Sequence, residues 1–322
     1  MAVIVTDKLG KQFGQIQALK EVSLAVERGE IFGLLGQNGA GKTTLIKILL
    51  GVISSSHGSA NVLNHPAGTT RVRRQIGYLP EDHRFPEYHT GASLLDFYGS
   101  LLDVPHRVRR QRIPEVLEMV GLKARMHSKI RTYSKGMKQR VGIAQAMLHE
   151  PELIFLDEPT DGVDPVGRRE IRELLERLKE QGITIFVNSH LLGEVELLCD
   201  RVGILQRGEL LRCGDIATLT RQQGVFLLRL AEGEELPLDE IKQLGFPADW
   251  DRERHLWEVQ IGTGQSIDPV LDLLHRKGLR LRHLVEKRQS LEDLFISMVD
   301  DQKQGRPTVR ERKSGVEEGR RS

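Results

Sequence analysis

Residues 31–50, IFGLLGQNGAGKTTLIKILL, constrain the possible folds of this chain more than any other stretch. The apolar run at residues 31–35 predicts a buried strand, and apolar residues recur at helical spacing from Leu45 onward. The loop between them fits the pattern G-x-x-x-x-G-K-[ST], in which backbone N–H groups surround phosphate oxygens. Glycine is favoured in such a loop because a side chain would block the close approach of the backbone to the anion. The stretch therefore predicts a strand, a helix and, between them, a phosphate-binding loop formed by Gly36, Gln37, Asn38, Gly39, Ala40, Gly41, Lys42, Thr43 and Thr44.

The side chains near this loop have separate expected roles. The N-terminus of the following helix directs its dipole and its free N–H groups at the anion. Lys42 is expected to reach the β- and γ-phosphates of a nucleoside triphosphate, and the Thr43 hydroxyl is expected to ligate Mg²⁺. Phe13 lies in a predicted loop at residues 8–14. It either stacks on an adenine face or packs in a small apolar cluster, and spacing alone leaves both interpretations open.

Composition bounds the class of protein. The 322 residues are enough for one large domain and a smaller one, and 29% charged with 39% hydrophobic residues is ordinary for a soluble globular chain. The formal net charge of +2 gives no argument for a nucleic-acid partner. Only Cys199 and Cys213 are present, which fits a reducing compartment. We expect neither a signal peptide nor a membrane span, so any membrane channel would belong to another chain.

The order of predicted elements before residue 221 indicates an α/β domain. A helical insertion, with its helices between Ser93 and Met147, separates the strand at residues 76–79 from the later strands. Asp164-Pro165 predicts a helix start, Gly182 its end, and Arg207-Gly208 a hairpin turn. The other predicted strands lie at residues 2–6, 22–26, 153–156 and 183–187.

The composition changes after about Arg221. Three strands and three helices are predicted, and Ser290 with Asp293 has the spacing of a capping box. Two β-α-β-like halves suggest a small α+β domain of ferredoxin-like type. The strands are expected at residues 225–230, 255–261 and 279–285, and the helices at 238–244, 267–277 and 290–299. From residue 301 to 322 the chain is polar and rich in arginine, which predicts disorder.

Four further elements extend the phosphate loop to a catalytic site. Asp157 follows a fully apolar strand, as a carboxylate that holds Mg²⁺ would, and Glu158 beside it can orient or activate water. His190 ends the next strand, where its imidazole can contact the γ-phosphate. Ser134 and Gly136 begin a helix, which supplies a second helix N-terminus suited to phosphate. Each element alone is usually structural, but their joint occurrence in this order favours a nucleotide hydrolase.

These motifs resemble the nucleotide-binding subunit of an ABC transporter, from about Val3 to Gly214. Residues 36–44 match the Walker A loop, and residues 153–158 match Walker B with the catalytic glutamate. Residues 161–164 match the D-loop, His190 the switch histidine, and residues 134–139 the family signature. Phe13 falls where the family has its adenine-stacking aromatic. The C-terminal addition resembles the accessory domain of bacterial exporters whose ATPase and membrane parts are separate chains.

The chain departs from the family pattern in two places. The signature reads Tyr-Ser-Lys-Gly-Met at residues 133–137 instead of Leu-Ser-Gly-Gly-Gln, which keeps the serine and the second glycine. Glu81 stands where the family usually has glutamine. A glutamate is still an oxygen ligand, so we expect tuned rather than abolished activity.

The resemblance implies the fold, the reaction and the partners. The fold would be a P-loop NTPase core of ABC ATPase type, at residues 1–220, with a helical subdomain at about 90–149. The accessory domain would span residues 221–300 and the tail 301–322. ATP and Mg²⁺ would be the cofactors, with Thr43, Asp157 and Glu81 at the metal and Lys42, Glu158 and His190 in catalysis.

Two such subunits, which we expect to be identical, would close head to tail over two ATP molecules. Each site would combine Lys42, Thr43 and Asp157 of one subunit with Ser134 and Gly136 of the other. Closure would move a separate integral membrane subunit, which contacts the region from Glu81 through the helical insertion, and would drive export from the cytoplasmic face of the membrane. No specific nucleic acid is expected.

Two other functions remain open from sequence. A soluble ABC machine acting on ribosomes or DNA usually has two cassettes in one chain or a long coiled-coil insertion, and this chain has neither. A regulatory nucleotide-binding module without turnover would be expected to lose Glu158 and His190, which are both present.

Overall fold

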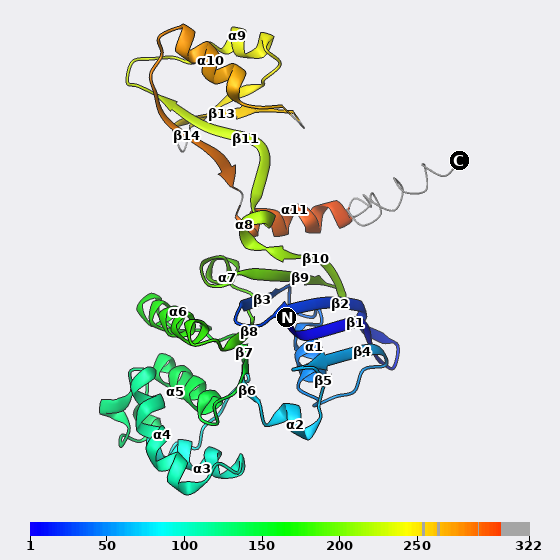
Figure 1. Ribbon diagram of the computed structural model, residues 1–322, viewed down its shortest axis with the longest axis vertical. Coiled ribbons are helices and arrows are strands. Elements are labelled where there is room, and N and C mark those ends of the chain that lie inside the picture. The colour runs from blue at the N-terminus through cyan, green and yellow to red at the C-terminus, as the bar shows by residue number, and fades with distance from the viewer. Residues whose placement is uncertain (253–254, 263–264, 289, 304–322) are drawn as a thin grey trace. The chain divides into compact units, whose positions relative to one another are not determined.

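The computed structural model describes residues 1–252, 255–262, 265–288 and 290–303 (Figure 1). Two compact units divide this chain. The N-terminal unit comprises Met1–Ile216, and the C-terminal unit begins at Ala217. The division falls four residues before the boundary that the sequence predicts at residue 220. Each unit has its own sheet architecture and its own apolar core, so each is described by itself.

The first sheet of the N-terminal unit is antiparallel, with the strand order β2-β1-β4-β5. Along β2, Val22, Leu24 and Val26 are buried and alternate with less buried residues, as their spacing predicts. This alternation places one face of the sheet against the core and the other toward solvent. The strands are β1 (Ala2–Phe13), β2 (Ile16–Glu27), β4 (His57–Val62) and β5 (His65–Pro66).

The loop predicted at residues 8–14 is wrong, because β1 continues to Phe13 and pairs with β2 as far as Ile16. The side chains of this part are mostly polar, so hydrophobic periodicity does not reveal it. Its backbone groups are nevertheless satisfied by the ladder with β2, which depends on tertiary pairing and not on local sequence. The strands β4 and β5 and the short helix α2 (Thr70–Arg73) are also missed for lack of an apolar pattern.

The second sheet is mostly parallel, with the strand order β10-β9-β3-β8-β7-β6. Every residue of β3, β7 and β8 is buried, which explains their continuous apolar sequences. The carboxyl ends of β7 and β8 lie side by side, with Asp157 opposite Asn188. The strands are β3 (Ile31–Leu35), β6 (Ile76–Leu79), β7 (Leu153–Asp157), β8 (Thr184–Asn188), β9 (Arg201–Gln206) and β10 (Glu209–Asp215).

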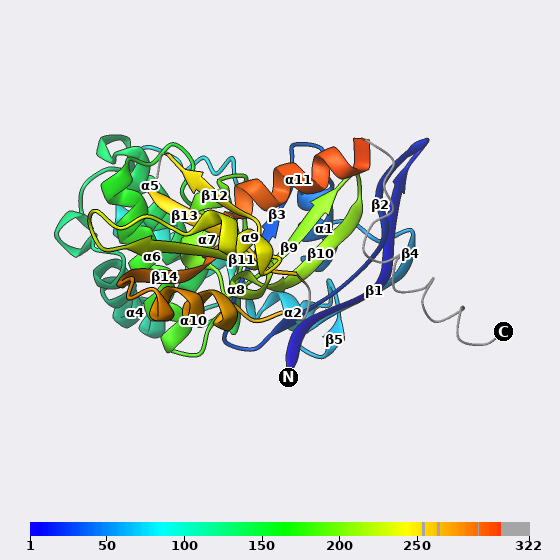
Figure 2. The same cartoon turned by 90° about the horizontal axis from the view of Figure 1, so that it is seen from above.

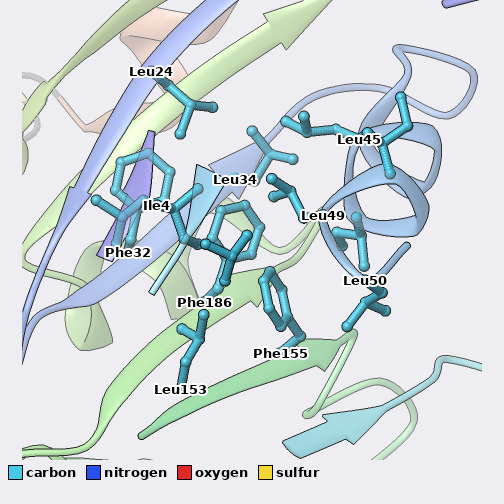
Figure 3. Packing of buried hydrophobic residues seen from close by; sticks show 14 of the residues in the cluster. Ile4, Leu24, Phe32, Leu34, Leu45, Leu49, Leu50, Leu153, Phe155 and Phe186 are labelled. Atoms are coloured by element: carbon cyan, nitrogen blue, oxygen red, sulfur yellow. The ribbon is translucent and has the colours of Figure 1, made fainter. Parts of the chain in front are cut away.

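The core of the N-terminal unit joins both sheets. Phe186 packs between Phe32 and Phe155, with ring centroids 5.5 and 5.2 Å apart (Figure 3). Side chains of the antiparallel sheet, such as Leu24, and of the helix after the phosphate loop, such as Leu49, complete the same cluster. Burial of each such side chain contributes roughly 1.5–3 kcal/mol. The core therefore holds the phosphate loop at the junction of the two sheets.

The helical insertion is present between β6 and β7 as predicted. It lies on the side of the N-terminal unit opposite the antiparallel strands (Figures 1 and 2). Its helices are α3 (Gly91–Leu101), α4 (His106–Met119) and α5 (Lys135–Met147), with two short 3-10 turns at Lys123–Arg125 and Ile130–Thr132. The remaining helices of the unit are α1 (Lys42–Leu49), α6 (Pro165–Glu180) and α7 (Leu192–Leu198), and α8 (Ile216–Leu219) follows at its end.

The C-terminal unit has the strand order β12-β13-β11-β14, and all its pairs are antiparallel. With helices after its first and third strands, this is the ferredoxin-like topology that the sequence predicts. The strand β12 is missed because its four residues, ADWD, carry two aspartates. The elements are β11 (Arg221–Leu230), α9 (Leu238–Gln243), β12 (Ala248–Asp251), β13 (Leu256–Gln260), α10 (Asp268–Arg276), β14 (Leu281–Arg288) and α11 (Leu291–Lys303).

The end of the C-terminal unit differs from the sequence prediction. Ser290 and Asp293 form the predicted capping box, since each backbone N–H donates to the other side chain at 3.1 and 3.0 Å. The helix α11 continues to Lys303, so the predicted disordered tail is wrong for residues 301–303. The rest of that prediction, residues 304–322, lies outside the described residues.

Candidate nucleotide-binding site

The phosphate loop follows β3 and is packed tightly against neighbouring backbone. A Cβ atom on Gly36 would lie 2.3 Å from the carbonyl oxygen of Leu205, and one on Gly41 would lie 2.5 Å from that of Ala18. Both distances are far below a van der Waals contact, so only glycine fits at these two positions. The loop is thus held between β9 and β2, and its shape depends on the tertiary structure around it.

Lys42 lies inside the loop. Only 6% of its surface is exposed, and its Nζ donates hydrogen bonds to the carbonyl oxygens of Gly36 at 2.6 Å and Gln37 at 3.2 Å. Burial lowers the pKa of Lys42, and the negative charges of Glu158, Asp157 and Glu81 oppose that shift. An ammonium group surrounded by loop carbonyls and carboxylates is placed to meet the terminal phosphates of a nucleotide.

Asp157 and Asn188 meet at the carboxyl ends of β7 and β8. The Asn188 amide donates a hydrogen bond to the Asp157 carboxylate, which is 2% exposed. Burial raises the pKa of Asp157, and this hydrogen bond opposes the shift. The Oδ1 atom of Asn188 is buried and has no hydrogen-bond partner within the described part of the chain. This pair therefore presents an acidic group and an unused oxygen acceptor beside the phosphate loop.

The Glu158 carboxylate is held by two neighbouring side chains. His190 Nδ1 lies 2.9 Å from its Oε1, and the Ser189 hydroxyl donates to its Oε2 at 3.2 Å. Its backbone has φ of 52°, a left-handed conformation that costs a non-glycine residue roughly 1–2 kcal/mol. Burial raises the pKa of Glu158, while His190 and Ser189 counteract the shift. A strained, buried carboxylate with a histidine partner is typical of a catalytic base.

Helix α5 supports the loop that carries Glu158. The side chain of Gln139 is buried, and its Nε2 donates to the carbonyl oxygen of Glu158 at 3.3 Å. The backbone N–H of Asp161 donates to the same oxygen at 3.2 Å. Lys135 Nζ forms an ion pair with the Asp161 carboxylate and donates a hydrogen bond to it at 2.9 Å. This hydrogen bond lowers the pKa of Asp161. The signature helix and the catalytic loop are therefore connected within one subunit.

These groups surround a cavity of about 640 Å³. Residues 38–44 form one wall, and Glu158 and His190 form another together with Asn188 and Glu81. The volume lies within the range of about 300–1,000 Å³ that is common for small-molecule sites. Residues 16–18 at the start of β2 form a further part of the lining, together with Lys42. A lining that contains this lysine and the phosphate loop fits a ligand with an anionic group.

The structure brings most of the predicted site residues together in this cavity, but not all. Gly36, Gln37 and Asp157 are not among the described lining residues, although they hydrogen-bond to the lining residues Lys42 and Asn188. Phe13 is 47% exposed at the end of β1, with Lys11 Nζ 4.9 Å from its ring centroid, and is not among the described residues that line the cavity. The Ser134 hydroxyl caps α5 by accepting the Met137 N–H at 3.2 Å. Ser134 and Gly136 likewise lie outside the described lining. Their predicted roles as nucleotide ligands stay predictions.

Sequence reasoning missed part of the lining. Ile16 and Lys20 of β2 and Arg207 of the β9–β10 turn all border the cavity. Asn188 directly follows the predicted strand at residues 183–187, and the sequence analysis gives it no role. No local signal marks these residues as part of a site, since their position depends on how distant strands pair.

The donor set fits Mg²⁺. This ion prefers oxygen ligands and is usually held by one or two carboxylates together with substrate phosphates. Asp157, the Thr43 hydroxyl and Glu81 are oxygen donors beside Lys42, and the orphan oxygen of Asn188 is a further acceptor. Among the described residues there is no cluster of three or more His, Cys, Asp or Glu side chains that could hold a metal unaided. Mg²⁺ would be held by these oxygen donors together with phosphate oxygens of the nucleotide.

Comparison with known proteins decides the family. The family model described as ABC transporter matches residues 19–161. An uncharacterized ABC transporter ATP-binding protein of Synechocystis sp. is 44% identical over 285 residues, covering 88% of this chain and 78% of that protein. The chain belongs to the ABC transporter ATP-binding proteins. The bacitracin transport ATP-binding protein BcrA of Bacillus licheniformis is 41% identical to this ABC protein over 301 residues, covering 92% and 97% of the two chains.

Solved structures agree with this assignment. An ATP-binding cassette in a dimeric post-hydrolysis state, bound to ADP and Pi, matches this ABC protein with a TM-score of 0.59 and 26% identity, over 66% of this chain and 98% of that chain. The predicted family and the predicted P-loop NTPase fold are therefore confirmed. This ABC protein is an ATP-hydrolysing subunit of a transporter. Within the described residues, no helix is both long and apolar enough to cross a membrane.

Proposed function

We propose that this subunit hydrolyses MgATP with Glu158 as the general base and uses the energy to drive export through a separate membrane subunit. One observation carries the catalytic part. The Glu158 carboxylate contacts His190 at 2.9 Å and borders the same cavity as Lys42 and the phosphate loop. A base, its orienting partner and a phosphate-binding cation are the parts that phosphoryl transfer to water requires.

Each residue has a definite task in this reaction. The loop N–H groups and Lys42 bind the β- and γ-phosphates and stabilise the charge that develops on them. Glu158 accepts the proton of the attacking water, and its raised pKa brings its basicity closer to the pH at which it works. His190 orients Glu158 and contacts the γ-phosphate. Mg²⁺, held by Thr43 and Asp157 with Glu81 nearby, would supply charge neutralisation at the phosphates.

A second subunit completes the site. Ser134 and Gly136 begin α5, yet they are not part of the described lining of their own subunit's cavity. The dimeric cassette to which the chain is similar supports an arrangement in which two subunits close over the nucleotide. We infer that Ser134 and Gly136 reach the γ-phosphate of ATP bound to a second copy, so that hydrolysis depends on closure.

The direction and location of transport rest on similarity. The match to BcrA, whose name describes bacitracin transport, extends over 92% of this chain and so includes the C-terminal unit. This supports export of a substrate selected by the membrane subunit. The subunit would work at the cytoplasmic face of the membrane, attached through that partner.

Replacement of Lys42 by alanine tests the proposed site. Lys42→Ala removes the cation placed to meet the terminal phosphates, so ATP binding should weaken and turnover should be nearly abolished. Lys47→Ala is the matched control, because Lys47 is exposed on the same helix and is not among the residues given a role in the site. ATP turnover and the Kd for MgATP are measured for both. Turnover of Lys42→Ala at the level of Lys47→Ala would refute the site.

A further inference from the structure

The turn between β9 and β10 is fixed onto the phosphate loop. The Gly208 N–H donates to the carbonyl oxygen of Ala40 at 2.9 Å, and the Gly208 carbonyl oxygen accepts the Lys20 N–H at 2.7 Å. Ala40 is in the middle of the phosphate loop, and Lys20 belongs to β2. The tip of the hairpin is thus tied by backbone hydrogen bonds to the wall that binds phosphate, and its first residue, Arg207, cannot move far from it.

Arg207 is an unfavourable residue for this turn. The backbone φ is 48° at Arg207 and 83° at Gly208, and two-residue turns with both φ values positive favour asparagine or aspartate followed by glycine. Arginine has no short side chain that could stabilise the left-handed conformation locally. The turn itself therefore gives no reason for an arginine, and strained residues of this kind concentrate at functional sites.

The charge of Arg207 is uncompensated. Its side chain is exposed and borders the cavity, and within the described part of the chain it has no hydrogen bond or ion pair. The other cation of this rim, Lys20, is paired with Glu209 at 3.0 Å. A guanidinium group is planar, permanently charged and suited to bind phosphate through two parallel hydrogen bonds.

We propose that Arg207 binds a phosphate of the nucleotide in this cavity and thereby sets the affinity of the subunit for ATP and ADP. The inference rests on the proposed function, because it assumes that the cavity holds the nucleotide. Phosphate is the expected contact and not the base, since the hairpin is anchored to Ala40 in the phosphate loop itself. Arg207 would act from outside the phosphate loop as a second cation, beside Lys42, that contacts the bound anion.

The test compares Arg207→Gln with Arg110→Gln in the full chain. Arg110 is exposed on α4 and is not among the described residues that line the cavity. Arg110→Gln changes the net charge by the same amount as Arg207→Gln and therefore serves as the control. The Kd values for MgATP and MgADP are measured by calorimetry at low salt. Arg207→Gln should weaken both about tenfold, the size of one charge-assisted hydrogen bond. Kd values within twofold of those of Arg110→Gln would overturn the proposal.

Two further measurements separate binding from folding and phosphate from base. Arg207→Asn creates the favoured Asn-Gly turn, so its Tm should not fall although its affinity for ATP falls as in Arg207→Gln. A loss of affinity only in proportion to a loss of Tm would mean a structural role and would overturn the proposal. The affinity deficit should also shrink at high salt, because a contact between exposed charges is screened. A deficit independent of salt would point to the base or ribose and would overturn the phosphate contact.

Measurement of Lys42→Ala in the same assay distinguishes a failure of the Arg207 proposal from a failure of the proposed nucleotide site. If Lys42→Ala weakens ATP binding and Arg207→Gln does not, only the role of Arg207 fails. If Lys42→Ala also binds ATP as the wild type does, the proposed site fails and the role of Arg207 fails with it.

Discussion

At the scale of single residues, the chemistry is concentrated where the local conformation is unfavourable. Glu158 has a positive φ and a buried carboxylate, and its pKa is raised by burial. Its carbonyl oxygen accepts hydrogen bonds from Gln139 of α5 and from Asp161 of the adjacent loop, which hold the residue there. A flexible glutamate at the same position would lose much of its effect, because a general base must be held at a fixed distance from the water.

Replacement of Glu158 by glutamine should separate binding from hydrolysis. Glu158→Gln keeps the size of the side chain and removes the charge that accepts a proton, so turnover should fall about 10²- to 10⁴-fold. MgATP should still bind, and the ATP-bound dimer should accumulate. Size-exclusion chromatography with light scattering, in the presence of ATP, measures the dimer, and ADP serves as the control nucleotide. A variant that stays monomeric and hydrolyses ATP normally would contradict the role of Glu158.

Replacement of Glu81 by glutamine tests whether the glutamate at this position, where the family usually has glutamine, matters for activity. Burial lowers the pKa of Lys42 and raises the pKa of Asp157, and the negative charge of Glu81 opposes the first shift and adds to the second. Glu81 also borders the cavity. Glu81→Gln keeps an oxygen that can face the metal, so hydrolysis should change by less than about tenfold, or 1.4 kcal/mol of barrier. Steady-state turnover at saturating MgATP measures this. A larger loss would show that the carboxylate itself is required.

At the scale of elements, α5 connects the signature sequence to the catalytic loop. Gln139 is 3% exposed and contacts the Glu158 carbonyl, while Lys135 pairs with Asp161 one turn earlier on the helix. These two contacts join the first turns of α5 to the loop that carries Glu158 and Asp161, so the helix and the loop should move together. A movement of the helical insertion would be transmitted directly to the backbone of the catalytic base.

Gln139→Leu tests this connection. The change removes a buried donor to the Glu158 carbonyl while keeping a similar volume, so stability should fall by about 1 kcal/mol. Because the base is then less well positioned, kcat should fall severalfold while KM for ATP stays nearly constant. Lys138→Ala, on the same helix but paired with Glu87, is the control and should retain normal kcat. A change in KM alone, or no change in kcat, would argue against a positioning role.

At the scale of the whole molecule, the two units divide the work. All the described residues that line the cavity lie between Ile16 and Arg207, within the N-terminal unit. The C-terminal unit has a separate core around Leu228, Ile241 and Val259. Nucleotide binding should therefore not require the C-terminal unit. We predict instead that this unit helps to pair two ATPase subunits.

Truncation tests this division. A chain ending after Thr220 should bind MgATP within about threefold of the full chain, because its cavity and core are intact, but its ATP-driven dimer should be weaker. The dimer is measured by light scattering in the Glu158→Gln background. A chain ending after Lys303 is the control and should dimerise as the full chain does. If the chain ending after Thr220 dimerises equally well, the C-terminal unit has another role.

The sequence by itself determined the phosphate loop, the buried strands that carry Asp157 and Glu158, and the ferredoxin-like order of the C-terminal elements. These features are readable because their signals are local: an apolar run, a glycine spacing or a helical period within a short window. The continuation of β1 to Phe13 and the strand β12 lack such signals, since pairing with a neighbouring strand and not the side-chain pattern forms them.

Only the tertiary structure decided which distant residues share the site. The pairing of β7 with β8 places Asn188 against Asp157, and the packing of the β9–β10 turn on Ala40 brings Arg207 to the cavity. Gln139 reaches Glu158 because α5 lies along the catalytic loop. Each of these contacts depends on strand register or helix packing between segments at least 19 residues apart. A local pattern cannot encode such contacts, because they follow from the free energy of the whole packed core and not from any single stretch.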